Sequence, residues 1–177
     1  EEYIKYLECD KTEKELHLVI DLITTNKTSF FREAEHFDYL LQKVVPNLQG
    51  RRLRLWCAGC SSGEEPFTIA MLLREGIPDI ECRDAKILAT DISLRMLERA
   101  RKGQYGGEAV SDLPRSFLQK YFAGNRSGSS LGYQVNDEVR AMGRLGKLNL
   151  MEPWPMKGPF NVIFCRNVMI YFDKATQ

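Results

Sequence analysis

The chain has 177 residues, of which 25 are lysine or arginine, 24 are aspartate or glutamate and 44% are hydrophobic. This length suits one globular domain, since a domain of about 150 residues buries roughly 70% of the surface that its unfolded chain exposes. The near-neutral charge argues against a nucleic-acid binder, and no apolar run reaches the roughly 18 residues that a membrane span needs. We therefore expect a soluble protein with no nucleic-acid partner and no membrane insertion.

The cysteines and the start of the chain indicate a compartment. The chain has five cysteines, an odd number in a sequence long enough to fold on its own core. That usage is typical of a reducing environment. No basic-then-apolar leader opens the chain, so we expect a cytoplasmic location.

Residues 1–46 are predicted to be helical. The apolar residues from Leu16 to Ile23 are spaced for one buried face, and a second helix is predicted from about Ser29, with Phe30 and Phe37 on its apolar side. Pro46 then breaks the helical pattern. We interpret 1–46 as a helical N-terminal segment and 47–177 as a second, α/β domain.

From residue 53 onward, strand and helix signals alternate. Strands are predicted at 53–57, 86–90, about 147–150 and 160–165, with a helix after each of the first two. Asp91 closes the second strand, and Ser93 is placed to cap the helix that follows it. This alternation is typical of a parallel sheet covered by helices.

The pattern weakens between residues 103 and 146, which we interpret as containing an inserted small subdomain. A helix is predicted around 117–122, a loop at 124–132, and a short hairpin through Tyr133, Val135 and Val139.

The first strand is followed by a turn rich in small residues, where a parallel sheet usually brings its backbone close to a ligand. Gly59 and Gly63 lack the spacing of a dinucleotide-binding loop. Glu64 and Glu65 stand where a pyrophosphate would meet the next helix, which favours a neutral or cationic ligand. Ser61 and Glu64 form a candidate capping box, but a second adjacent glutamate exceeds what a cap requires.

Asp91 is a second candidate ligand contact, because a carboxylate at the end of this strand can accept both hydroxyls of a ribose. Its alternative is to cap the next helix, a position that Ser93 already fills. The turn and the strand end together predict a ligand that contains a nucleoside.

The sequence from Trp56 to Cys60 also resembles the Trp-Cys-x-x-Cys redox motif, so a redox protein is an alternative. Redox chemistry leaves the paired glutamates and Asp91 unexplained, and alternation places Cys57 on the buried face of its strand. A zinc site is disfavoured because the histidines, His17 and His36, both lie in the helical N-terminal part. We predict no metal.

Four segments carry a family resemblance: 26–33 (NKTSFFRE), 63–66 (GEEP), 89–92 (ATDI) and 164–172 (FCRNVMIYF). In this order they resemble the CheR-type chemotaxis receptor methyltransferases. The resemblance implies a Rossmann-like fold and an S-adenosylmethionine-dependent enzyme that methylates glutamate side chains of chemoreceptors. It also implies a cytoplasmic chemoreceptor domain as the protein partner, and we expect a monomer. A non-catalytic cofactor-binding or receptor-binding module is the alternative.

The resemblance also implies functional roles. The residues that it implies near the transferred methyl group are Arg32 and Tyr171. The residues that it implies in cofactor binding are Asn26, Thr28, Arg32, Gly59, Glu65, Asp91, Asn149, Leu150, Arg166 and Asn167. Taken alone, Asn26 and Thr28 could cap a helix, Arg32 could be a solvated charge, and Tyr171 could only bury its ring.

The resemblance has two further consequences. The segment 103–146 corresponds to the family's small β subdomain, which in some members tethers a receptor tail, although 139–147 lacks the aromatic strand residue of that subdomain. The family also has a longer helical N-terminal domain and further strands after the Tyr171 region. We therefore expect this chain to be a fragment without those C-terminal strands, and less stable than a longer chain.

Overall fold

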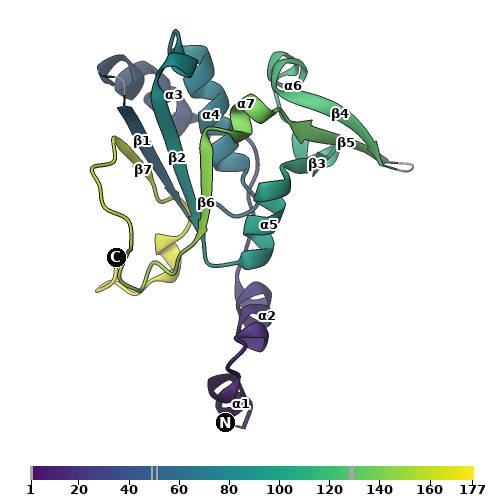
Figure 1. Cartoon of the computed structure of the whole chain (residues 1–177), viewed down its shortest axis with the longest axis vertical. Coiled ribbons are helices and arrows are strands. Elements are labelled where there is room, and N and C mark those ends of the chain that lie inside the picture. Colours follow the sequence, from purple (N-terminus) through teal and green to yellow (C-terminus); the bar gives the residue numbers. More distant parts are fainter. Residues whose placement is uncertain (1, 49, 51, 128–129) are drawn as a thin grey trace.

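The computed structural model describes residues 2–48, 50, 52–127 and 130–177. Its main sheet has four strands, in the order β6-β2-β1-β7, and every neighbouring pair is parallel. These strands are β1 (Arg52–Ala58), β2 (Asp84–Asp91), β6 (Gly143–Lys147) and β7 (Val162–Phe164). The α/β prediction is therefore confirmed (Figure 1).

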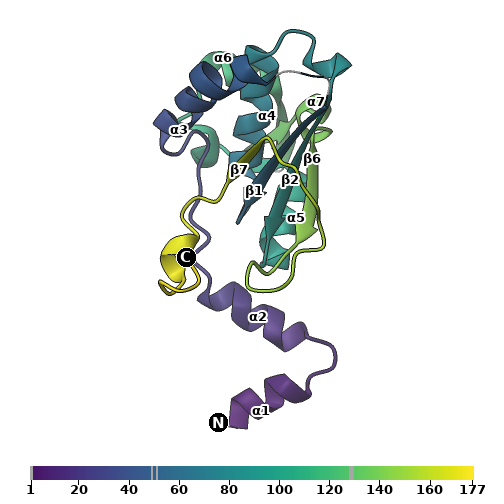
Figure 2. The ribbon, with the colours of Figure 1, turned by 90° about the vertical axis from the view of Figure 1, so that its left-hand side faces the viewer.

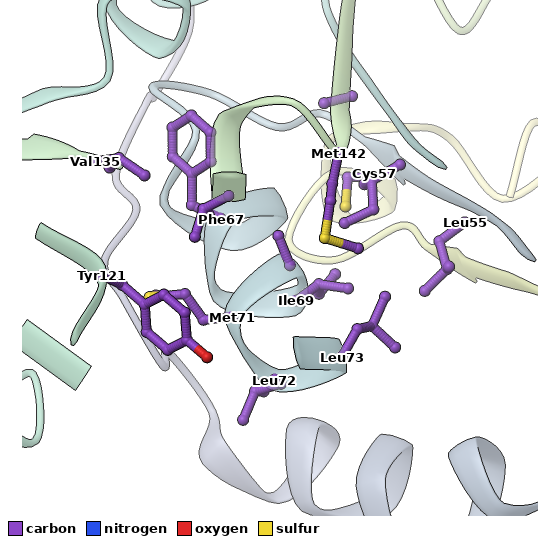
Figure 3. Close-up of a cluster of buried hydrophobic side chains, with 14 of the residues drawn as sticks. Leu55, Cys57, Phe67, Ile69, Met71, Leu72, Leu73, Tyr121, Val135 and Met142 are labelled. Atoms are coloured by element: carbon purple, nitrogen blue, oxygen red, sulfur yellow. The ribbon is translucent and has the colours of Figure 1, made fainter. Parts of the chain in front are cut away.

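A helix follows each of the two central strands. Helix α4 (Glu64–Gly76) follows β1, and α5 (Leu94–Lys102) follows β2. Ile69 and Leu73 of α4 are fully buried and lie close to Leu55 and Cys57 of β1 in the core (Figure 3). Burial of such aliphatic side chains stabilises a fold by about 1.5–3 kcal/mol each. The core therefore fixes the end of β1, and with it the turn that carries the glycines.

A second apolar cluster lies apart from this core. Trp56 packs against the rings of Trp154 and Phe160, with centroids 4.8 and 5.6 Å away, and Leu148 belongs to the same cluster. These contacts hold the segment between β6 and β7 against the sheet. A short 3-10 turn, η3 (Ile80–Cys82), connects α4 to β2.

A small antiparallel sheet stands to one side of the main sheet (Figure 1). Its strands, in the order β3-β5-β4, are β3 (Gln104–Gly106), β5 (Ser130–Val135) and β4 (Phe122–Ser127). The helical elements around it are η4 (Glu108–Val110), α6 (Arg115–Tyr121) and α7 (Asp137–Arg140). The predicted hairpin was misplaced, because β5 pairs with β4 and Val139 lies on α7.

The first two helices, α1 (Glu2–Cys9) and α2 (Lys14–Ile23), extend away from this body (Figure 2). Helix α3 (Ala34–Tyr39) continues as a π turn, η1 (Leu40–Val44), and a 3-10 turn, η2 (Val45–Asn47), and these elements pack on the body through Phe37, Leu40 and Val45. The predicted buried face of α2 was wrong, because α2 has no buried residue.

The second N-terminal helix begins later than predicted, at Ala34 rather than near Ser29. Phe30 packs edge-on against Tyr105 and Phe122, with ring centroids 4.9 and 5.5 Å away. Phe31 has a left-handed backbone, with φ of 54°, and packs against Phe117. These long-range aromatic contacts override the local helical pattern.

Two predicted strands also have different bounds. The third main strand ends at Lys147, where the prediction began it, and the fourth runs only from Val162 to Phe164. β6 is a sheet edge with the polar sequence GRLGK, so its burial does not alternate clearly. Leu148 and Leu150, on which the strand prediction was based, follow β6 and pack in the second cluster.

Candidate active site

One cavity of about 400 Å³ lies at the carboxyl ends of the main strands. Its volume is within the range of about 300–1,000 Å³ that is typical of small-molecule sites. Its wall contains every residue predicted for the site: Asn26, Thr28, Arg32, Gly59, Glu65, Asp91, Asn149, Leu150, Arg166, Asn167 and Tyr171. Segments far apart in the sequence therefore meet where parallel sheets place ligands.

The turn after β1 is fixed by backbone hydrogen bonds. The N–H groups of Gly59 and Cys60 donate to the carbonyl of Thr90, at 2.8 and 2.9 Å. Gly59 has a φ of +78°, and a Cβ there would lie 2.3 Å from Cγ2 of Val168. Only glycine fits both the conformation and the space. The turn therefore brings bare backbone to the cavity wall.

Asp91 ends β2, as predicted, and its carboxylate joins two turns. Oδ2 accepts from the N–H of Ser61 at 2.7 Å, and Oδ1 accepts from the N–H of Ser93 at 2.9 Å. Burial raises the pKa of Asp91, and these backbone donors oppose the rise. The cap of α5 is Ser93, whose Oγ accepts from the N–H of Met96 at 3.1 Å. A carboxylate has about four acceptor sites, so Asp91 retains capacity for ligand hydroxyls.

The two glutamates that begin α4 differ in environment. Glu64 is buried away from the cavity wall, and the hydroxyl of Ser62 donates to both of its carboxylate oxygens. The predicted capping box was wrong, because the N-cap is Gly63, with φ of 99°, and Ser61 donates instead to the carbonyl of Asn26. Glu65 lines the cavity, and burial raises its pKa to about 7 despite the nearby Arg166.

Arg166 joins the end of β7 to the N-terminal segment. Its Nη1 lies 3.2 Å from Oε2 of Glu65 and its Nη2 lies 3.1 Å from Oε2 of Glu33. Nη2 also donates to the carbonyl of Arg32, and the guanidinium stands 5.0 Å from the ring centre of Phe37. Within the described residues the buried Nε has no partner. The site thus holds a cation between two carboxylates.

Glu33 is a residue that the sequence analysis did not assign. Its Oε1 accepts from Nδ2 of Asn167 at 3.1 Å, and its hydrogen bonds to Asn167 and Arg166 lower its pKa. Glu33 and Asn167 both have left-handed backbones, with φ of 57° and 56°. Strained non-glycine residues of this kind gather at functional sites. In the sequence Glu33 directly follows the predicted Arg32, and its pairing with Arg166 and Asn167 becomes visible only in the fold.

The N-terminal segment contributes an extended strip to the cavity. Nδ2 of Asn26 donates to Oγ1 of Thr24 at 3.0 Å, and no helix begins at Asn26 or Thr28, so neither residue is a helix cap. Nη1 of Arg32 donates to the carbonyl of Lys27 at 2.8 Å. This bond turns the guanidinium of Arg32 back along the segment that lines the cavity.

Two further parts of the wall follow strands. Asn149 is held in a local turn, because Nδ2 donates to Glu152 at 2.9 Å and Oδ1 accepts from the N–H of Met151 at 3.0 Å. Tyr171 is 62% exposed in the 3-10 turn η5 (Met169–Tyr171), so its ring is not buried. The wall residues that were missed are mostly sequence neighbours of those predicted, such as Ser61, Ile92, Leu148 and Val168.

The buried cysteines argue against the redox alternative. Burial raises the pKa of both Cys57 and Cys60 well above the usual value. Disulfide exchange requires a thiolate, which an electropositive and exposed setting favours. Within the described part of the chain, no group of three or more His, Cys, Asp or Glu side chains is placed to hold a metal ion. No helix in that part is long and apolar enough to cross a membrane.

The wall fits a cationic ligand that contains a nucleoside. Asp91 retains acceptor capacity for hydroxyls, and Gly59 gives the ligand access to backbone. Glu65 has a pKa of about 7 because it is buried, so a cation bound beside it would favour its ionised form. Arg166 lines the same cavity and gives its wall one cation, held between Glu65 and Glu33.

Comparisons with known proteins agree with this geometry. Residues 26–177 match the family described as CheR methyltransferase, SAM binding domain. The chain is 43% identical over 185 residues to the chemotaxis protein methyltransferase of Borreliella burgdorferi, covering 99% of this chain and 64% of that protein. It is 38% identical over 176 residues to the Escherichia coli chemotaxis protein methyltransferase, covering 99% of this chain and 60% of that protein.

A third relative, chemotaxis protein methyltransferase 2 of Vibrio cholerae, is 38% identical over 181 residues, covering 99% of this chain and 62% of that protein. The chain therefore spans less than two thirds of the length of these curated relatives. The matched part is the domain that binds S-adenosylmethionine, which confirms the predicted cofactor. The chain belongs to the CheR methyltransferase family.

Proposed function

We propose that this chain catalyses methyl transfer from S-adenosylmethionine to glutamate side chains of chemoreceptors, forming glutamyl methyl esters. The observation that carries the proposal is that Asp91, Glu65 and Arg32 line one and the same cavity. The names of the curated relatives, which are chemotaxis protein methyltransferases, support the same reaction class.

The cofactor contacts in this proposal are those that the family resemblance implies, and the chemistry of the wall supports them. Asp91 accepts the ribose hydroxyls, and Asn149 and Leu150 flank the adenine. Glu65 would attract the cationic methionine end, and Asn26 and Thr28 would contact the cofactor from the N-terminal segment. Arg166 lines the same cavity and would supply positive charge toward the carboxylate of the methionine part, and Asn167 holds the same wall through Glu33.

Bound S-adenosylmethionine supplies a sulfonium methyl group: a carboxylate oxygen bonds to the methyl carbon while the methyl–sulfur bond breaks, and sulfur keeps the electron pair. A glutamate with a pKa of about 4.3 is already ionised at neutral pH, so no proton has to be removed. This explains why a wall without an activated cysteine or a histidine is sufficient.

In this proposal, two side chains orient the incoming carboxylate. Arg32 lines the cavity, and the exposed Tyr171 lines it from η5. Correct orientation of reactants contributes up to about 7–11 kcal/mol to lowering a barrier. A strong ion pair would stabilise the nucleophile before attack, so orientation is the main contribution of Arg32.

The experiment is incubation of the protein with methyl-labelled S-adenosylmethionine and chemoreceptor membranes. Base-labile label on the receptor supports the proposal. Tight cofactor binding without label on the receptor would instead favour the alternative, a non-catalytic regulatory module.

A further inference from the structure

The near-neutral charge of the chain is unevenly distributed over its surface. Helix α5, helix α7 and strand β6 share one face whose cationic side chains are exposed, except for the half-buried Arg140. We call it the α5–β6 basic face, and it contains Arg95, Arg99, Arg101, Lys102, Arg140, Arg144 and Lys147. The carboxylates paired with cations of this face are Glu98, Asp137 and, from helix α2 and the residue before it, Asp21 on Arg95 and Glu13 on Lys147. Cations therefore outnumber acids here.

The periodicity of α5 explains the first half of this face. Arg95, Arg99 and Lys102 are spaced at i, i+4 and i+7, so they share one side of the helix. Met96 and Ala100 are buried on the opposite side. Packing of the apolar side against the sheet therefore forces the cationic side into solvent.

The second half surrounds a cavity of about 250 Å³ between α4, α5 and β6. Arg101, Arg140 and Arg144 all line this cavity. Nη2 of Arg140 donates to the carbonyl of Arg101 at 3.0 Å, which brings these two residues together. Within the described residues, the guanidinium of Arg144 donates only to two backbone carbonyls, at 3.1 and 3.5 Å. It therefore retains donors for an external anion.

The acids nearby neutralise this cavity only weakly. Arg101 pairs with Glu98 at 2.7 Å, and Arg140 pairs with Asp137 at 3.1 Å. Asp137 is almost fully exposed, and more than half of the Arg101 and Glu98 side chains is exposed. Such solvent-exposed pairs contribute little energy, so a partner carboxylate can compete with them.

The face reaches the mouth of the cofactor cavity. Lys147 directly precedes Leu148, and Arg95 lies three residues after Ile92, and both Leu148 and Ile92 line that cavity. Helix α5 is about 13 Å long at 1.5 Å per residue. A partner bound along α5 would therefore lie next to the cavity in which the methyl group is transferred.

We propose that the α5–β6 basic face docks an acidic segment of the protein substrate, with a substrate carboxylate seated among Arg101, Arg140 and Arg144. The proposal rests on the proposed function, because a glutamate-methylated substrate necessarily carries carboxylates. Continuity with the transfer cavity favours this occupant over a nucleic acid or a lipid surface. Rim charges of this kind mainly set the association rate and its dependence on salt.

The test uses two double variants, Arg101→Gln with Arg144→Gln and Arg99→Gln with Lys102→Gln. A combined variant carries all four substitutions. Lys43→Gln with Arg52→Gln is the matched control, because it removes the same charge as one pair from exposed positions outside the face. For methylation of a purified chemoreceptor cytoplasmic fragment, we expect the combined variant to raise KM about tenfold, equivalent to about 1.4 kcal/mol. Its kcat and its affinity for S-adenosylhomocysteine stay unchanged, and its salt dependence weakens.

An unchanged KM and salt dependence in the combined variant, with active wild type, would overturn the docking proposal. If the wild type transfers no methyl group, the proposed function has failed. The docking proposal is then tested separately, by comparing how tightly the wild type and the combined variant bind the same receptor fragment. Duplex DNA and vesicles of anionic lipid serve as competing probes. If the combined variant loses binding to the DNA or to the vesicles but still binds the receptor fragment, the docking proposal is also overturned.

Discussion

Substitution of Gly59 by alanine tests the geometry of the cofactor wall most sharply. The new Cβ would lie 2.3 Å from Cγ2 of Val168, and the residue would keep a φ of +78°. A left-handed backbone costs an alanine about 1–2 kcal/mol, and overpacking typically costs about 1–3 kcal/mol. We therefore expect Gly59→Ala to lower the free energy of unfolding by about 2–5 kcal/mol.

For a chain of this size, each kcal/mol shifts Tm by about 2–4 °C, so Gly59→Ala should lower Tm by roughly 4–20 °C. Calorimetric melting of the cofactor-free protein measures this. Gly106→Ala is the matched control, because a Cβ there has nothing within 4 Å. We expect the control to stay within about 0.5 kcal/mol of the wild type.

A double-mutant cycle separates the two costs. Val168→Ala removes the clashing Cγ2, so the double variant Gly59→Ala with Val168→Ala should recover the overpacking part and keep the backbone part. If the two substitutions are simply additive, Val168 does not contact the turn as the structure places it. If Gly59→Ala melts like Gly106→Ala, the reasoning about both costs is wrong.

Three further variants test the wall. Asp91→Asn should weaken S-adenosylhomocysteine binding about 10- to 100-fold in calorimetry, since hydrogen bonds to a charged group contribute about 1.5–3 kcal/mol, and unchanged affinity would refute the ribose contact. Arg32→Ala should reduce turnover much more than cofactor affinity, and equal losses in both would exclude a role specific to transfer. Because Glu65, with a pKa of about 7, is protonated below that pH and ionised above it, affinity for the cationic cofactor should rise from about pH 6 to 8. Glu65→Gln should abolish that rise, and a rise that persists would show that another group titrates.

The alternating strands and the ends where ligands bind could be predicted from the sequence, because both depend on local patterns. Asp91 ends β2 as predicted, and Cys57 is buried as alternation required. The family motifs then supplied wall residues on separate segments, which periodicity alone does not bring together. All of them line the same cavity.

The errors have a common physical cause, which is long-range packing. The segment before Ala34 resembles a helix locally, but Phe30 and Phe31 are buried or half-buried against aromatic rings of distant elements. The role of Glu33 depends on Arg166 and Asn167, more than 130 residues away in the chain. A single sequence gives no signal for such a pairing beyond the chemistry of the three side chains.

The most direct test of the proposed reaction is the chemical identity of the transferred group. The protein is incubated with methyl-deuterated S-adenosylmethionine and a chemoreceptor cytoplasmic fragment, and the digested fragment is analysed by mass spectrometry. Our account predicts deuterated methyl esters on glutamate side chains, which alkali releases as methanol. Label on nitrogen or sulfur, or an unlabelled fragment alongside normal cofactor binding, would contradict it.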